Sequence, residues 1–286
     1  MMITRELADH LIHASRAKKR PFAGQALVAA GVLLLIATLF IKPQDDSDVM
    51  SMLWLLPHVA LVGLLVWAMR FGQQQREQSQ RMLSGFEAVQ LREWDRAAQS
   101  LNDLLSRPIR HARARVAALL SLAVVAEADD GYDVSQHIYE AILSENTGDP
   151  LQQHTARVGL AAAMLRNGQI TDGIRLIEKL ERAELTGPLK AQIELLSLFR
   201  EVTMGQAAGG IERADQRRDL FRAHLGTRAG YGYGLLAMAF DRAEQPDNAR
   251  KEWYNATLLL GAKELIARFR ELEPIARKYA AAENPV

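Results

Sequence analysis

Two long apolar runs lie near the N-terminus, and the chain after them alternates apolar and polar positions with helical spacing. Residues 22–41 and 50–69 are each twenty residues long and contain no Asp, Glu, Lys or Arg. About 20 residues at ~1.5 Å per residue cross the ~30 Å hydrocarbon core of a bilayer. The pattern predicts two transmembrane helices, joined by a short extracytoplasmic loop at 42–49 and preceded by a cytoplasmic basic or amphipathic segment at 1–21.

Basic residues flank the predicted hairpin on both sides. Four of them lie within residues 16–20, and Arg70 and Arg76 follow the second run, whereas the loop holds one Lys against three Asp. Lys and Arg resist translocation, so both flanks are expected in the cytoplasm. The sequence therefore predicts a multi-pass protein of a bacterial-type inner (cytoplasmic) membrane, with both termini inside.

The first residues leave two interpretations open. Ile3, Leu7 and Leu11 fall at helical spacing, and the stretch ends in a basic cluster at 18–20. An amphipathic helix lying on an anionic leaflet has this pattern. A polar tail whose basic end only sets the topology has it too.

Residues 70–286 read as helical throughout. Strand alternation is nearly absent, while Ala, Leu, Arg, Glu and Gln, all good helix formers, dominate. Gly and Pro fall between the helical stretches, for example at Gly131, Gly168 and Pro246. This arrangement predicts a cytoplasmic domain built from successive helical hairpins.

A spacing pattern repeats within this domain. A small residue is followed twelve positions later by a second small residue. Large residues lie four and seven positions after the second one, except that the final position of the last copy is small. The paired small residues, expected where two helices cross closely, are Gly85 and Ala97, Ala123 and Ser135, Ala161 and Gly173, and Ala237 and Ala249. The first three copies step by 38 residues, and the last lies two further steps away.

The repeat divides the domain into units. They are predicted at about 78–115, 116–153, 154–191, 192–229 and 230–263, followed by a terminal cap at 264–286 that is broken or bent at Pro274. The unit at 192–229 is degenerate. Its helices are expected at Gln192–Met204 and about Glu212–Leu225, separated by a Gly205–Gly210 loop.

The residues at three predicted turns resemble those of a known family. Trp94-Asp95-Arg96-Ala97, Gly131-Tyr132-Asp133 and Gly168-Gln169-Ile170 are similar to the turn into the second helix of the tetratricopeptide repeat (TPR), although the period here is about four residues longer. The resemblance implies an all-α, TPR-like solenoid after the hairpin, with a concave face that holds a peptide or helix of another protein.

Composition and motifs limit which ligands and reactions can be expected of this chain. Of 35 basic and 34 acidic residues, residues 1–69 hold six and five, which leaves 29 of each afterwards and argues against nucleic-acid binding. The chain has no Cys, and its seven His residues are scattered. Gly230-Tyr-Gly-Tyr-Gly234 lacks the flanking signals of a phosphate loop and is expected to be a flexible start of the last repeat. No enzyme activity, cofactor, metal or small-molecule substrate is predicted.

Two basic clusters are candidate sites for an acidic peptide or lipid headgroups. The alternative is a pair of solvated faces matched by nearby Asp and Glu. The clusters are Arg107, Arg110, Arg113 and Arg115, and Arg213, Arg217, Arg218 and Arg222.

These observations favour a membrane-anchored scaffold or adaptor for protein–protein interactions. The alternative is an integral accessory subunit of a membrane transport, secretion or envelope-assembly complex, with the hairpin as its main interface. An enzyme would need a cavity with converging polar groups, and no motif points to one.

Overall fold

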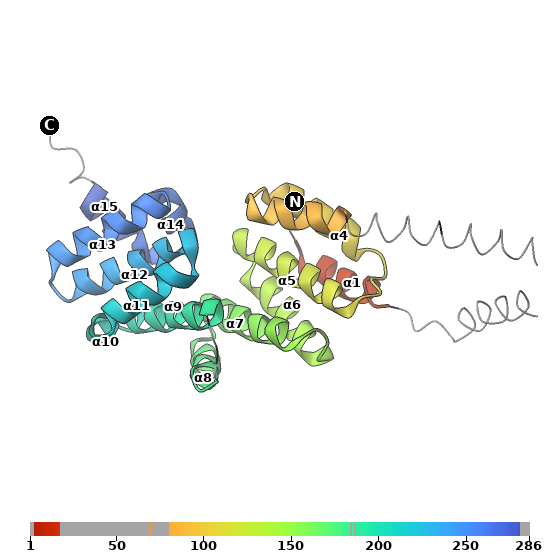
Figure 1. Ribbon diagram of the computed structural model, residues 1–286, viewed down its shortest axis with the longest axis horizontal. Helices are drawn as coiled ribbons and strands as arrows, with labels where there is room; N and C mark the ends of the chain where they lie inside the picture. The colour runs from red at the N-terminus through yellow and green to blue at the C-terminus, as the bar shows by residue number, and fades with distance from the viewer. Residues whose placement is uncertain (1–2, 18–68, 70–79, 184, 186, 281–286) are drawn as a thin grey trace, which may run out of the picture. The chain divides into compact units, whose positions relative to one another are not determined.

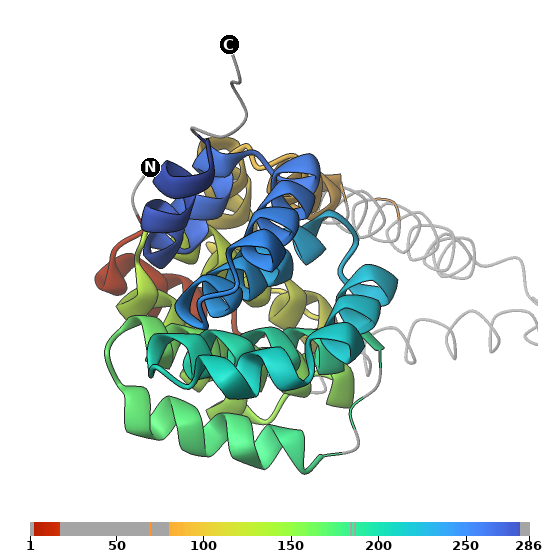
Figure 2. The ribbon, with the colours of Figure 1, turned by 90° about the vertical axis from the view of Figure 1, so that its left-hand side faces the viewer.

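The computed structural model describes residues 3–17, 69, 80–183, 185 and 187–280. The regular structure within this part is helical (Figures 1 and 2). Residues 80–90 are helical. The elements with defined bounds are α1 (Arg5–Ala14), α4 (Trp94–Leu105), α5 (Ala112–Ala128), α6 (Tyr132–Glu145), α7 (Pro150–Arg166), α8 (Ile170–Glu181), α9 (Gly187–Thr203), α10 (Ala207–Glu212), α11 (Ala214–His224), η1 (Gly226–Arg228), α12 (Ala229–Arg242), α13 (Pro246–Leu259), α14 (Ala262–Arg268), η2 (Arg270–Leu272) and α15 (Glu273–Ala280).

The predicted membrane hairpin needs correction. Among the described residues, no helix combines the length and the apolar composition that a bilayer crossing requires. Helices α5, α7 and α9 have 17 residues each, about 25 Å at ~1.5 Å per residue, which is shorter than the ~30 Å core. The predicted spans at 22–41 and 50–69 lie outside the described residues apart from Met69. This finding overturns the predicted fold class with a hairpin and the inner-membrane localisation, and neither is carried further.

Two compact units divide the chain, and each is taken by itself. The first contains Asp9–Ser121, and the second contains Met2–Ala8 and Leu122–Val286. The boundaries fall inside α1 and α5, so both helices contribute residues to both units.

In the first unit, an arginine joins the end of α1 to α5. Arg115 donates from Nε to Ser15 Oγ at 2.9 Å and from Nη2 to the carbonyl of Ile12 at 2.8 Å. A cation at a helix C-terminus satisfies carbonyls that have no partner within the helix. Leu11 and Ile12 are buried in protein. Part of the apolar side of α1 is therefore used in internal packing.

The turn between α6 and α7 follows directly from its residues. Asn146 ends α6 in the left-handed conformation, with φ 47°, which Asn tolerates better than most residues. Asp149 then accepts a bond from the backbone N–H of Gln152 at 2.8 Å, and the Gln152 side chain accepts from the Asp149 N–H at 3.2 Å. Pro150 occupies the first helical turn. These are local start and stop signals.

In the second unit, helices that follow one another in the chain pack together. Helix α7 contacts α6 and α8, α8 contacts α9, and α12 lies beside α13 in both views (Figures 1 and 2). A large core cluster joins α9 and α11 to α15 and includes Phe221, Leu235, Trp253 and Leu272. Burying a large apolar side chain stabilises the fold by roughly 1.5–3 kcal/mol, so this cluster fixes the C-terminal helices on α9 and α12.

Three local predictions are corrected in this region. The expected Gly205–Gly210 loop contains helix α10, which begins directly after Gly205 (φ 78°) and Gln206. Pro274 lies at the start of α15, where its missing N–H is tolerated, and the chain instead breaks at Phe269, with φ −132° and ψ 89°. Residues 230–234 are helical, within α12.

Candidate functional site: an arginine–aromatic cluster

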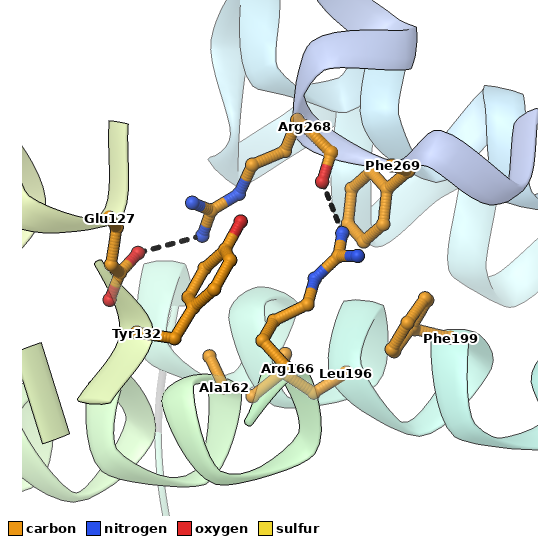
Figure 3. A pocket seen from close by; sticks show the side chains of 8 residues that line it. All are labelled: Glu127, Tyr132, Ala162, Arg166, Leu196, Phe199, Arg268 and Phe269. Carbon is orange, nitrogen blue, oxygen red and sulfur yellow. Dashed lines mark hydrogen bonds and ion pairs between the residues drawn. The ribbon is translucent and has the colours of Figure 1, made fainter. Parts of the chain in front are cut away.

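An arginine–aromatic cluster in the second unit encloses a small cavity. It surrounds a cavity of about 20 Å³, enough for about one water molecule. Side chains from α5, α6, α7, α9 and α14 converge on it (Figure 3). Its residues are Glu127, Tyr132, Ala162, Arg166, Leu196, Phe199, Arg268 and Phe269.

Arg166, the last residue of α7, occupies the centre of the cluster. Its guanidinium carbon lies 4.7 Å from the ring centroid of Phe199 and 4.6 Å from that of Phe269, so the cation lies against both rings, whose centroids are 5.2 Å apart. Its Nη2 donates to the carbonyl of Arg268, the last residue of α14 (Figure 3). Burial lowers the pKa of Arg166, while the Glu271 charge acts in the opposite direction. Arg166 therefore caps α14 from a different helix.

Arg268 completes the link back toward α5. Its Nη2 donates to Glu127 Oε2 at 2.9 Å, and the hydroxyl of Tyr139 donates to Glu127 Oε1 at 2.9 Å. Burial disfavours the charged form of Arg268, but the Glu127 carboxylate outweighs it and raises the pKa of Arg268. Burial and the Glu127 charge raise the pKa of Tyr139 well above its ordinary value. Both carboxylate oxygens of Glu127 are thus engaged.

A glycine in α7 leaves room for the Tyr139 ring, which takes part in these hydrogen bonds. A Cβ at Gly159 of α7 would lie 2.3 Å from Cζ of Tyr139. Only glycine leaves space there for the phenol ring. The glycine in α7 therefore positions Tyr139 against Glu127, and Glu127 positions Arg268.

The charges of the cluster are matched. Arg268 pairs with Glu127, and Arg166 lies 3.3 Å from both oxygens of Glu271. Arg270 adds an exposed pair with Asp130. These contacts join residues 102 to 141 positions apart in the chain. With paired charges and room for about one water, the arrangement joins helices; it offers no space for a substrate.

Most arginines of the second predicted basic cluster form ion pairs. Arg217 is 1% exposed and bonds Glu201 and Glu194, and Arg213 reaches the same two carboxylates. Arg218 pairs with Glu252 at 2.9 Å and with Asp215. Arg222 is exposed, and a hydrogen bond with Tyr233 raises its pKa. Arg217 therefore belongs to the core, which corrects its assignment to a partner-binding surface.

Glu252 of α13, which pairs with Arg218, is a buried carboxylate whose negative charge is only partly compensated. Its side chain is 1% exposed, and one of its oxygens, Oε2, has no hydrogen-bond partner. Burial raises the pKa of Glu252, against the lowering effect of Arg218. The ionised carboxylate is accordingly held at a cost to stability, which Arg218 only partly offsets.

The first predicted basic cluster likewise contains both exposed and buried arginines. Arg107, Arg110 and Arg113 are exposed: Arg107 and Arg110 lie in the turn between α4 and α5, and Arg113 in the first turn of α5. Arg115 is 5% exposed and is held by α1.

The paired small residues of the repeat are all buried. A Cβ at Gly85 would lie 3.3 Å from Leu101 Cδ2, and one at Gly173 would lie 2.9 Å from Leu165 Cδ2. Ala97, Ala123, Ser135, Ala161, Ala237 and Ala249 are each 0% exposed. The two glycines therefore lie close to leucine side chains, and the other six residues have no exposed surface.

Sequence reasoning missed Arg166, Arg268 and Glu127. No motif marks them, because each is a charged residue at a helix end or on a helix face, as on any soluble helix. Arg268 ends the short helix α14 and Phe269 follows it, within the segment that the sequence analysis assigned to a terminal cap. The separation of more than 100 residues hides their pairing.

In the part of the chain that the structure describes, no group of three or more His, Cys, Asp or Glu residues is placed to hold a metal ion. No protein-family model, curated protein or solved structure matches the sequence or fold of this chain.

Replacing Arg166 by lysine is expected to lower the free energy of unfolding by about 1 kcal/mol, since lysine keeps the charge but loses the planar fork. Lysine has no planar group that could lie against Phe199 and Phe269 while also bonding the Arg268 carbonyl. Urea unfolding followed by circular dichroism measures the change. The matched control is Arg175→Lys, at a side chain that is 76% exposed, which should change stability by less than about 0.5 kcal/mol. Equal stability of the two variants would contradict the assigned role of Arg166.

Proposed function

We propose that this protein is a scaffold or adaptor for protein–protein interactions, whose helix pairs present a surface to a peptide or helix of another protein. The observation that carries the proposal is the packing order in the second unit: α6 on α7, α7 on α8, α8 on α9, and α12 on α13. Helices stacked in chain order create extended surfaces rather than one deep pocket.

The distribution of charge supports the same function. Several buried ionisable groups, among them Glu127, Glu201 and Arg217, are used in ion pairs between helices. Large apolar side chains are instead exposed, including Leu151 on α7, Ile170 on α8 and Leu258 on α13. Exposed apolar groups on a rigid helical frame are typical anchors for a partner.

Photo-crosslinking in the native cell tests this function. A photoreactive amino acid is placed singly at positions 151, 170 and 258 of the full chain, and at position 175 as an exposed polar control. The expected result is a defined protein adduct at one or more of the three apolar positions and none at the control. Identical background at all four positions would refute the scaffold function.

A further inference from the structure

Helix α13 carries an apolar strip that no described part of the chain covers. Tyr254, Leu258 and Leu259 are 54%, 65% and 39% exposed. Tyr254 and Leu258 are one helical turn apart and share a face. The opposite side of α13 is buried on α12 through Ala249, Trp253 and Ala256. We call Tyr254, Leu258 and Leu259 the α13 strip.

Exposed cations border the α13 strip. Lys251 lies one turn before Tyr254, and Lys263 is exposed at the start of α14. Arg250 is 59% exposed, and its contact with Asp247 is long, at 3.9 Å. Such a pair in water contributes little and leaves the cation available. The border beside the apolar residues is therefore basic.

The N-terminal end of α13 has the opposite sign. Glu244 is exposed, and the Asp247 side chain is 97% exposed. An anionic membrane surface would attract the basic border but repel these two carboxylates. A second copy of this chain, docked symmetrically through Leu258, would bring its own basic border against the first. A protein segment can match both signs along its length.

We propose that the α13 strip binds an amphipathic helix of another protein, with apolar anchors one turn apart and acidic residues flanking them. The anchors pack on Tyr254, Leu258 and Leu259, and the acidic residues face Lys251, Arg250 and Lys263. Apolar anchors at helical spacing in a groove or on a helix face are a common mode of recognition. This inference rests on the proposed scaffold function and names its partner class.

The direct test uses a panel of synthetic amphipathic helical peptides with identical apolar positions. Half carry Glu at the flanking positions, and half carry Lys. Binding to the purified full chain is measured by fluorescence anisotropy. The acidic members are expected to bind about tenfold or more tightly than the basic ones, with weakening at higher salt. Absence of that preference would overturn the proposal.

Variants locate the binding on α13. Leu258→Glu should weaken the acidic peptides about tenfold or more, and Lys251→Glu should reverse part of the acidic preference. Leu83→Glu is the matched control, because Leu83 is 64% exposed in the helical segment 80–90 and receives the same change. Thermal melts of all three variants should coincide with wild type, since each replaces an exposed side chain. Binding unchanged by Leu258→Glu would overturn the assignment to α13.

Two further measurements separate the competing occupants. Flotation with phosphatidylserine-containing vesicles that depends on Leu258 would replace the protein partner by a lipid surface. Sedimentation showing a dimer that Leu258→Glu dissolves would replace it by a second copy. Cross-links at positions 151 or 170 but none at 258 would refute this inference and leave the scaffold function intact, whereas no cross-links at any position would refute both.

Discussion

Replacing Arg217 by methionine is expected to lower the free energy of unfolding by about 3 kcal/mol, because the change removes the buried partner of Glu201 and leaves that carboxylate only Arg213 and Arg200. Arg217 in α11 is 1% exposed. Its guanidinium bonds both oxygens of Glu201, at 2.8 and 3.0 Å, Glu194 at 3.1 Å and the carbonyl of Gly210 at 3.1 Å. Urea unfolding monitored by circular dichroism measures the loss.

The control is a second arginine on the same carboxylates. Arg213 reaches Glu201 at 3.0 Å and Glu194 at 3.5 Å, but its side chain is 45% exposed. Arg213→Met should therefore cost less than about 1 kcal/mol. Similar losses for the two variants would show that burial does not distinguish these arginines.

The pH dependence of the same cluster has a definite sign. Burial opposes the charged form of Glu201, but the hydrogen bonds and charge of Arg217 outweigh it and lower the pKa of Glu201. A carboxyl whose pKa is lowered by folding contributes stability above its ordinary pKa of ~4.3 and loses it as the pH falls through the lowered value. The stability difference between wild type and Arg217→Met should therefore shrink below about pH 4. A difference independent of pH from neutral to strongly acidic conditions would contradict this ion pair.

The second large effect is expected at Gly232, in α12. Replacement by alanine should destabilise the fold by about 2–3 kcal/mol, although alanine is the better helix former by about 1 kcal/mol. The added Cβ would lie 2.2 Å from Cδ2 and 2.5 Å from Cε2 of Phe221. Phe221 is 0% exposed, so its ring has no free space into which to move. The midpoint of urea unfolding reports the change.

A glycine in α10 provides the matched control. The nearest atoms to a Cβ at Gly209 are 4.0 Å away, on the Glu201 side chain. Gly209→Ala should therefore be neutral or slightly stabilising. Combining Gly232→Ala with Phe221→Leu should cost less than the sum of the two single changes, because the smaller side chain frees space. Strict additivity would rule out the ring contact as the cause.

Helix positions and the small residues at helix crossings could be read from the chain itself. Turn signals such as Asp149-Pro150 act within a few residues, and the structure uses them where they occur. Ala97 and Ala237, selected from a spacing pattern, are buried at helix contacts. The TPR likeness, the solenoid and the scaffold function stay predictions. The prediction of a membrane hairpin rested on apolar composition, and the described helices do not support it.

The charged residues could not be assigned in this way. Arg217 and Arg222 are five positions apart and look alike in the sequence, yet one is buried and the other exposed. The difference arises because Glu201 and Glu194 come from α9, 16 and 23 positions away. Gly232 reads as part of a flexible glycine-rich stretch until α11 brings Phe221 against it.

The sequence by itself determined that this is a helical chain, where many helices begin and end, and which small residues are buried, because these properties depend on neighbours within one or two turns. The tertiary structure alone decided which arginines join helices, that Arg166 caps α14, and that Tyr254 and Leu258 face outward. Those outcomes depend on partners up to 141 positions away, and local propensity carries no information about such distant neighbours.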